Sequence, residues 1–464
     1  MFSQSLVLLV ALVPAALAAQ APVFVPPALT PLSTSTNYTG ATNGTLSNQT
    51  VVPGKVFDRF IQIWLENTDY NDAATSQAFM ELKSQGLLLS QYYAVTHPSE
   101  PNYAAVVGGD FWGMGDDNWY NIPSNISTVI DLLEDKSISW ASYMENMPDD
   151  GFQGFNFTSP NYLNASAPDY TYYVRKHNPP ILYDSVVSVP ERLARIRNFN
   201  DLVADVNASA IPQWLFITPN MVNDGHDTSI DFASEWLEFW LPTMLADPNF
   251  NDNRTIILLT FDENESYNIN NRIYTLVLGN GLPANLKGQE DDTYYTHYSA
   301  ISTVQANWGL KSLGRQDTNK TVSNVFSFVA SATNYTNMNV TGDAVPLTNL
   351  TTVFNGPLNA AQYVPFTAPN MNASGAGGQG VFVAPSLNTS FTAAVAPGPV
   401  NLTALGEVVP ASGPPNGTVP GAPAPTTSGS GGSGGSGSSG ALALAAVPGA
   451  LTLALGALVG AVLL

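Results

Sequence analysis

The chain has 464 residues, a formal charge of −21 at pH 7 and only 15 Lys and Arg residues. So few basic residues argue against binding to nucleic acid, because affinity for nucleic acid depends on Lys and Arg. Cysteine is absent, which excludes disulfides, thiolate metal sites and a cysteine nucleophile. The fold must therefore be stabilised by burial, and the segment 53–340 is long enough to form one large or two modest cores.

Both ends of the chain resemble processing signals. Residues 1–18 contain an apolar run followed by small residues, which is typical of a secretory signal peptide. At the other end, a Ser/Gly-rich spacer over 428–440 precedes an uncharged apolar tail over 441–464, the order found in GPI-attachment signals. No Lys or Arg follows the tail, which disfavours its alternative, a transmembrane anchor. We therefore expect a secreted protein that a lipid anchor holds at the plasma membrane. The cell wall is a further expected location.

The flanks differ in composition from the middle of the chain. Residues 19–52 are rich in Pro, Ser, Thr and N-x-S/T sequons, and residues 341–440 form a low-complexity stretch of Pro, Gly, Ser and Thr. We interpret them as a glycosylated N-terminal flank and a stalk. Because sequons recur from Asn37 to Asn416, a secreted form should be heavily glycosylated. Residues 53–340 are left as the catalytic domain.

Between these flanks, apolar runs alternate with helical patterns. The patterns predict helices over 72–84, 127–135 and 231–246. The runs predict strands over 59–65, 87–95, 139–144, 213–218, 254–261 and 273–278. This alternation indicates an α/β layered fold with a mostly parallel central sheet and helices on both faces.

Polar residues follow three of these predicted strands. Glu66 and Asn67 end the first run, Asn220 and Asp224 follow the run over 213–218, and the Asp262-Glu263 pair follows that over 254–261. Ligands bind at the carboxyl ends of parallel strands, and carboxylate and amide oxygens suit a divalent cation. Each cluster alone is better explained by a helix cap or a turn. Their recurrence after three strands favours a site.

The motif Thr-His-Pro-Ser-Glu-Pro-Asn-Tyr over 96–103 follows the second predicted strand. It places Ser99 before a helix that we expect to begin near Pro101. A lone serine in this position is usually an N-cap. A helix N-terminus also binds phosphate, and a hydroxyl beside a metal loses its proton more easily. Ser99 is therefore the candidate nucleophile.

The four histidines all lie in polar motifs flanked by Pro, Gly or Tyr. His177 and His226 are candidates to contact phosphate oxygens or to protonate a leaving group. His97 is equally well explained as a turn residue. His297 is expected to cap a helix that runs to Trp308, with a role in the site as the alternative.

Six motifs in a fixed order carry a resemblance to a known family. They are WLENTDYN, HPSEPNY, KHNPP, NDGHD, FDENE and THYS, and the resemblance covers residues 57–309. In this order they resemble the fungal acid phosphatases, which are grouped with bacterial acid phosphatases and phosphocholine-type phospholipases C. These enzymes are distantly similar to alkaline phosphatases and sulfatases.

The resemblance implies an alkaline-phosphatase-like fold and a site with one divalent metal ion. Ser99 would be a nucleophile that forms a phosphoseryl intermediate, and His177 and His226 would contact the phosphoryl group. The implied metal ligands are Glu66, Asn67, Ser99, Asp262 and Glu263, and the implied substrate-binding residues are Asn102, Asn220, Asp224 and His297.

Two positions qualify the resemblance. Phospholipase-like members carry G-P-T-x-P-N-R in the nucleophile motif, whereas this chain has His97, Ser99 and Tyr103 there, which favours phosphatase over lipase activity. Asn264 is a sequon inside the metal motif. We expect it to stay unglycosylated because a glycan would block the cleft.

The sequence therefore predicts an extracellular acid phosphatase that hydrolyses small phosphomonoesters. One alternative is a phospholipase C or phosphodiesterase of the same family. Another, from a different class, is a non-enzymatic GPI-anchored cell-wall glycoprotein. That alternative accounts for the flanks but not for polar clusters after three separate strands.

Overall fold

A computed structural model describes residues 41–162, 166–345, 354–359 and 362–384. Its main sheet has eight strands in the order β10-β2-β9-β8-β1-β7-β3-β6. β9 runs antiparallel to both neighbours, and the other pairs in this sheet are parallel. The strands are β1 (Arg59–Leu65), β2 (Leu87–Tyr93), β3 (Trp140–Met144), β6 (Ile196–Asn198), β7 (Trp214–Thr218), β8 (Thr255–Phe261), β9 (Thr275–Leu278) and β10 (Glu290–Thr296).

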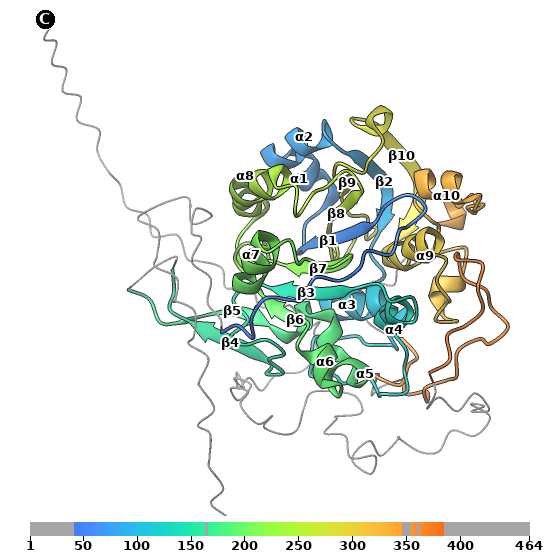
Figure 1. Cartoon of the computed structure of the whole chain (residues 1–464), viewed down its shortest axis with the longest axis horizontal. Helices are drawn as coiled ribbons and strands as arrows, with labels where there is room; N and C mark the ends of the chain where they lie inside the picture. The colour runs from blue at the N-terminus through green and yellow to red at the C-terminus, as the bar shows by residue number, and fades with distance from the viewer. Residues whose placement is uncertain (1–40, 163–165, 346–353, 360–361, 385–464) are drawn as a thin grey trace, which may run out of the picture. The chain divides into compact units, whose positions relative to one another are not determined.

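Helices cover both faces of this sheet (Figure 1). Right-handed crossovers decide the face: the connections from β1 to β2 and from β7 to β8 run towards β10, whereas that from β2 to β3 runs the other way. Accordingly α2 packs against α8, while α3 packs against α9. The helices are α1 (Tyr70–Thr75), α2 (Gln77–Lys83), α3 (Ser99–Gly108), α4 (Val129–Glu134), α5 (Asp184–Val187), α6 (Pro190–Leu193), α7 (Phe199–Asn207), α8 (Ile230–Ala246), α9 (His297–Trp308) and α10 (Ser327–Thr333).

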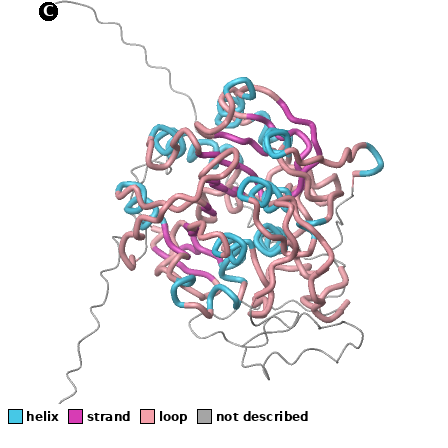
Figure 2. Tube along the Cα trace, turned by 45° about the vertical axis from the view of Figure 1, so that its right-hand side comes forward, coloured by secondary structure: helices cyan, strands magenta, loops and turns pink. Residues whose placement is uncertain are grey.

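The central strands are apolar because they are covered on both sides (Figure 2). Every residue of β7 and β8 is buried, as is all of β1 after its first residue. Trp64 of β1 packs between Tyr103 of α3 and Phe216 of β7, with ring centroids 5.0 and 5.2 Å away. The predicted α/β layered fold with a mostly parallel sheet is confirmed.

Strand register brings the predicted clusters to one edge. Leu65 of β1 pairs with Phe261 of β8, so Glu66 and Asp262 emerge side by side. The Asp262 amide donates to the Leu65 carbonyl at 3.0 Å, which extends the pairing to the edge. β7 lies on the other side of β1 in parallel register and delivers its following loop to the same edge.

A separate hairpin, β4 (Asn156–Ser159) and β5 (Tyr170–Val174), forms a two-stranded antiparallel sheet. It leads directly into a short 3₁₀ helix, Arg175–His177. The hairpin therefore delivers His177 from outside the main sheet.

Three helix predictions need correction. The helix over 72–84 is two helices, because Ser76 adopts extended backbone angles and interrupts it. α3 begins at Ser99 itself with Pro98 as N-cap, so Ser99 is the first helical residue rather than a cap before a helix starting near Pro101. Thr296, not His297, caps α9, since its side chain accepts a hydrogen bond from the Tyr298 amide.

Parts of both predicted flanks pack against the predicted catalytic segment. The Ala41 amide donates to the Pro148 carbonyl at 2.6 Å, and Leu358 is buried in the core. Val381 forms an isolated bridge with Ser312. The division into five segments stays a prediction. The predicted signal peptide and the GPI-signal tail lie outside the described residues, as does the stalk beyond residue 384. Among the helices in the described ranges, none has the length and apolarity needed to cross a bilayer.

Candidate active site

Ser99 and Tyr103 converge on one buried carboxylate. Ser99 Oγ donates to Glu66 Oε2 at 3.1 Å, and the Tyr103 hydroxyl donates to Glu66 Oε1. Residues four apart share a helix face, so the first turn of α3 presents both hydroxyls to the end of β1. Ser99 is thus held beside an acceptor for its proton.

Four carboxyl groups are buried together at this edge of the sheet: Glu66, Asp224, Asp262 and Glu263. Burial raises the pKa of Glu66 well above its ordinary value, and repulsion from Asp262 and Asp224 raises it further. Burial also raises the pKa of Asp262 to about 7, although Lys176 opposes this effect. The site therefore carries more acidic groups than its own basic groups neutralise.

Asn67 lies between these carboxylates. Its backbone φ is 21°, and asparagine tolerates positive φ better than most residues do. The backbone N–H of Asn67 donates to Asp262 Oδ1 at 3.2 Å. In one orientation, the side-chain nitrogen donates to Glu66 and Glu263 at 3.2 and 3.3 Å. In the other, the side-chain oxygen faces those acceptors, an arrangement that a cation would satisfy. Asp262 Oδ2 is buried without a hydrogen-bond partner, whereas Glu263 Oε2 lies 2.5 Å from His97 Nδ1. The unpartnered Asp262 oxygen and the neighbouring carboxylates fit a cation.

His177 bridges two of the carboxylates. Its Nε2 lies 3.2 Å from Glu66 Oε1 and its Nδ1 lies 3.4 Å from Asp224 Oδ2. Its ring stacks on Tyr103 with centroids 5.2 Å apart. Burial lowers the His177 pKa well below its ordinary value, and Lys176 and His226 lower it further.

His226 lies nearer to solvent. Its Nδ1 is 2.7 Å from Asp227 Oδ1 and its Nε2 is 3.2 Å from Lys176 Nζ. Nitrogen and oxygen atoms of Glu66, His177 and His226 all lie within 4.8 Å of one another, so this triad could also hold a metal ion. The triad shares only Glu66 with the ligand set implied by the resemblance.

Three predicted substrate-binding residues are occupied in other ways. Asn102 Oδ1 accepts from the amides of residues 95 and 96, and its nitrogen donates to the carbonyls of residues 96 and 98. This uses its full hydrogen-bonding capacity, so it fixes the loop before Ser99. Asn220 fixes the turn after β7 by accepting from the amides of residues 222 and 223. His297 Nε2 contacts the Asp262 carbonyl oxygen at 2.6 Å and supports that residue from below.

The structure adds four residues that we did not predict. Tyr103 could have been found by its spacing from Ser99, and Lys176 by its place beside His177. Asp117 gave no signal, because it lies in an irregular loop. Glu145 directly follows the predicted strand over 139–144 and could have been found by the criterion that selected Glu66. Lys176 Nζ donates to Asp117 Oδ2 at 2.9 Å.

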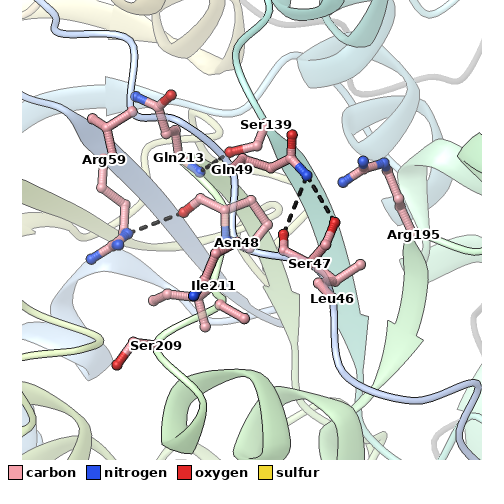
Figure 3. Close-up of a pocket in the computed structure, with 13 residues that line it drawn as sticks. Leu46, Ser47, Asn48, Gln49, Arg59, Ser139, Arg195, Ser209, Ile211 and Gln213 are labelled. Carbon is pink, nitrogen blue, oxygen red and sulfur yellow. Dashed lines mark hydrogen bonds between the residues drawn. The ribbon is translucent and has the colours of Figure 1, made fainter.

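A cavity lies at the opposite edge of the sheet, where the strands begin (Figure 3). It measures about 100 Å³, and its lining includes Arg59, Ser139 and Gln213, which lie at or just before the starts of β1, β3 and β7. Arg59 Nε donates to the Pro212 carbonyl and the Gln213 amide to Ser139 Oγ. Its polar side chains are thus engaged by protein groups, and none of the residues of the carboxylate cluster lines it.

The mostly parallel sheet thus carries a serine and a group of buried carboxylates at its carboxyl edge. Residues 41–311 match the Phosphoesterase family, and the chain belongs to that family. This confirms the resemblance seen in the six motifs.

Fungal relatives extend this finding. The chain is 48% identical over 323 residues to an acid phosphatase of Aspergillus fumigatus, covering 69% of each chain. It is 47% identical over 328 residues to a probable acid phosphatase of Kluyveromyces lactis, covering 71% of this chain and 74% of that one. These relatives confirm the predicted enzyme class, a phosphatase. Among solved structures, an alkaline phosphatase superfamily protein of Vibrio parahaemolyticus matches 57% of this chain and 70% of its own at 11% identity, with a TM-score of 0.33.

Proposed function

We propose that this protein is an acid phosphatase that hydrolyses phosphate monoesters through a phosphoseryl intermediate on Ser99. The observation that carries the proposal is the hydrogen bond from Ser99 Oγ to the buried carboxylate of Glu66. It places a hydroxyl at the start of a helix, where anions are favoured, and beside a proton acceptor. The relatives named as acid phosphatases support the same reaction.

One divalent cation would be held by Glu66, Asn67, Ser99, Asp262 and Glu263. The support is chemical: the buried Asp262 Oδ2 has no hydrogen-bond partner, and the Asn67 amide oxygen faces only acceptors in one of its orientations. When bound, such an ion would ease deprotonation of the serine and offset charge on the phosphoryl group. The triad of Glu66, His177 and His226 is the competing donor set.

The protein's own groups then account for the proton and bond changes. Ser99 Oγ bonds to phosphorus while its proton passes towards Glu66 Oε2, and the bond from phosphorus to the ester oxygen breaks. If His177 or His226 is protonated, it gives a proton to the leaving alkoxide. Water then attacks the phosphoserine and passes one proton to that histidine while its oxygen bonds to phosphorus. The bond from phosphorus to Ser99 Oγ breaks, phosphate leaves, and Ser99 Oγ takes back the proton held by Glu66.

We also propose that the enzyme acts outside the cell, held there by its lipid anchor. Sequons at Asn125, Asn207 and Asn253 are exposed, as glycosylation in the secretory pathway requires. Asn264 is buried, and its side-chain nitrogen donates to Asp69 and to the Ser266 carbonyl. This supports the expectation that Asn264 carries no glycan.

A comparison of three substrates tests the reaction. Purified enzyme should release p-nitrophenol from p-nitrophenyl phosphate faster than from bis-p-nitrophenyl phosphate, and should leave phosphatidylcholine intact. Faster diester or lipid cleavage would favour the phosphodiesterase or phospholipase alternative. No cleavage of any substrate by metal-loaded protein would favour the non-enzymatic glycoprotein.

A further inference from the structure

The buried site opens to solvent past a small group of charged side chains. Ser99 is 1% exposed and Glu66 is fully buried. The side chains of Lys176, His226 and Asp117 are 13, 15 and 22% exposed. A substrate that approaches from solvent would therefore meet these three residues before it reached Ser99.

Asp117 joins this group to the helix that carries Ser99. Its Oδ1 accepts a hydrogen bond from the Glu100 amide at 2.9 Å, and its Oδ2 accepts one from Lys176 Nζ at 2.9 Å. Pro101 has no amide hydrogen to offer. The first turn of α3 therefore has fewer free donors for phosphate than an ordinary helix N-terminus, and another group must supply positive charge.

Lys176 is the residue placed to supply that charge. The positive charge of Lys176 lowers the pKa of all four buried carboxyl groups at the edge of the sheet. No other basic side chain in the described ranges has this effect on all four. Its neighbour Arg175 points elsewhere, since it donates to the carbonyls of Tyr120 and Ile181.

The hydrogen bonds of Lys176 use two of its three N–H donors. An ammonium group has three N–H donors, and two of them serve Asp117 Oδ2 and His226 Nε2. Because His226 Nε2 accepts from an ammonium, its ring hydrogen lies on Nδ1 and points to Asp227. In this arrangement Lys176 keeps one N–H donor for a ligand, whereas His226 Nε2 has none to offer.

We propose that Lys176 is a phosphate-binding residue that donates to a non-bridging oxygen of the substrate, and that Asp117 positions it against the N-terminus of α3. This inference rests on the proposed phosphatase function. It adds the group that attracts an anion into a site lined with carboxylates. Loss of a hydrogen bond from a charged donor corresponds to about 10- to 100-fold in affinity.

The absence of cysteine permits a sharp test. Lys176→Cys introduces the only thiol, and alkylation with 2-bromoethylamine restores an ammonium group on a side chain of similar length. We would measure the dissociation constant of inorganic phosphate by calorimetry, and metal content, before and after alkylation. Lys176→Met gives the same loss of charge without a reactive thiol, and Lys83→Met removes an exposed lysine as the control.

We expect the thiol and methionine variants to bind phosphate about 10- to 100-fold more weakly, with unchanged metal content, and alkylation to recover most of the loss. Asp117→Asn should weaken phosphate binding to a smaller extent. Phosphate affinity within twofold of the wild type in both Lys176 variants would overturn the proposal, as would the same loss in the Lys83 control. Phosphate binding is measured without turnover. The result can therefore be interpreted even if Ser99 is not the nucleophile.

Discussion

Replacing Glu145 by Gln should remove part of the pH dependence of stability. Glu145 follows β3 and is 2% exposed. Its Oε2 accepts from the Asn220 amide at 2.9 Å, and both of its oxygens accept from Asn223 Nδ2 at 3.0 and 2.9 Å. It lies outside the implied metal ligands, so its titration reports on the fold.

The magnitude follows from the pKa of Glu145. Burial raises that pKa from 4.5 to about 7, and the hydrogen bonds from Asn220 and Asn223 only partly offset the rise. The folded state thus holds the proton more tightly than the unfolded chain does. The contribution of Glu145 to stability is complete below pH 4.5 and is lost as pH rises towards about 7. A shift of this size corresponds to about 3 kcal/mol.

Urea unfolding measures this contribution. The wild type should lose more stability than Glu145→Gln between pH 4.5 and about pH 8, by up to about 3 kcal/mol. The other buried carboxyl groups remain in both proteins, so their effects cancel in the difference. Glu235→Gln, on the exposed side of α8, is the matched control. Parallel stability curves for wild type and Glu145→Gln would refute the reasoning.

Three further predictions concern the metal, the histidines and the tail. Asp262→Asn and Glu263→Gln should lower the metal content, because an amide replaces an anionic ligand; full stoichiometry by elemental analysis in both would contradict the proposed ligand set. His177→Ala and His226→Ala should keep their metal but lose about ten- to a thousandfold in turnover. Metal loss in these two variants would instead favour the histidine triad. Deleting residues 441–464 should send active enzyme into the medium, and activity that stays with the membrane fraction would argue against the lipid anchor.

The strands that were predicted from the sequence are those rich in apolar residues. β1, β7 and β8 lie at the centre of the sheet, where both faces are buried, so their composition reveals them. β10 was missed because it is an edge strand whose first half is acidic and partly exposed. Its sequence, EDDTYYT, has no apolar run.

The sequence could predict those site residues that directly follow a strand. Glu66 and Asp262 follow paired central strands, and parallel register then fixes their proximity. Lys176 lies in the short 3₁₀ helix after the β4–β5 hairpin and Asp117 lies in an irregular loop. Neither segment has a periodic pattern that could be recognised in the sequence. Asn102 shows the converse, because a polar residue in a catalytic motif can serve the backbone of its own loop.

The central claim is that Ser99 is the nucleophile, and trapping the intermediate tests it most directly. Wild-type enzyme would be mixed with p-nitrophenyl phosphate, quenched in acid during turnover, digested and sequenced by tandem mass spectrometry. The account predicts one phosphoryl group on the Ser99 peptide, and none after the same treatment of Ser99→Ala, which should be inactive. If turnover is normal but Ser99 is never phosphorylated, or if Ser99→Ala keeps more than about a tenth of wild-type activity, covalent catalysis by Ser99 is contradicted.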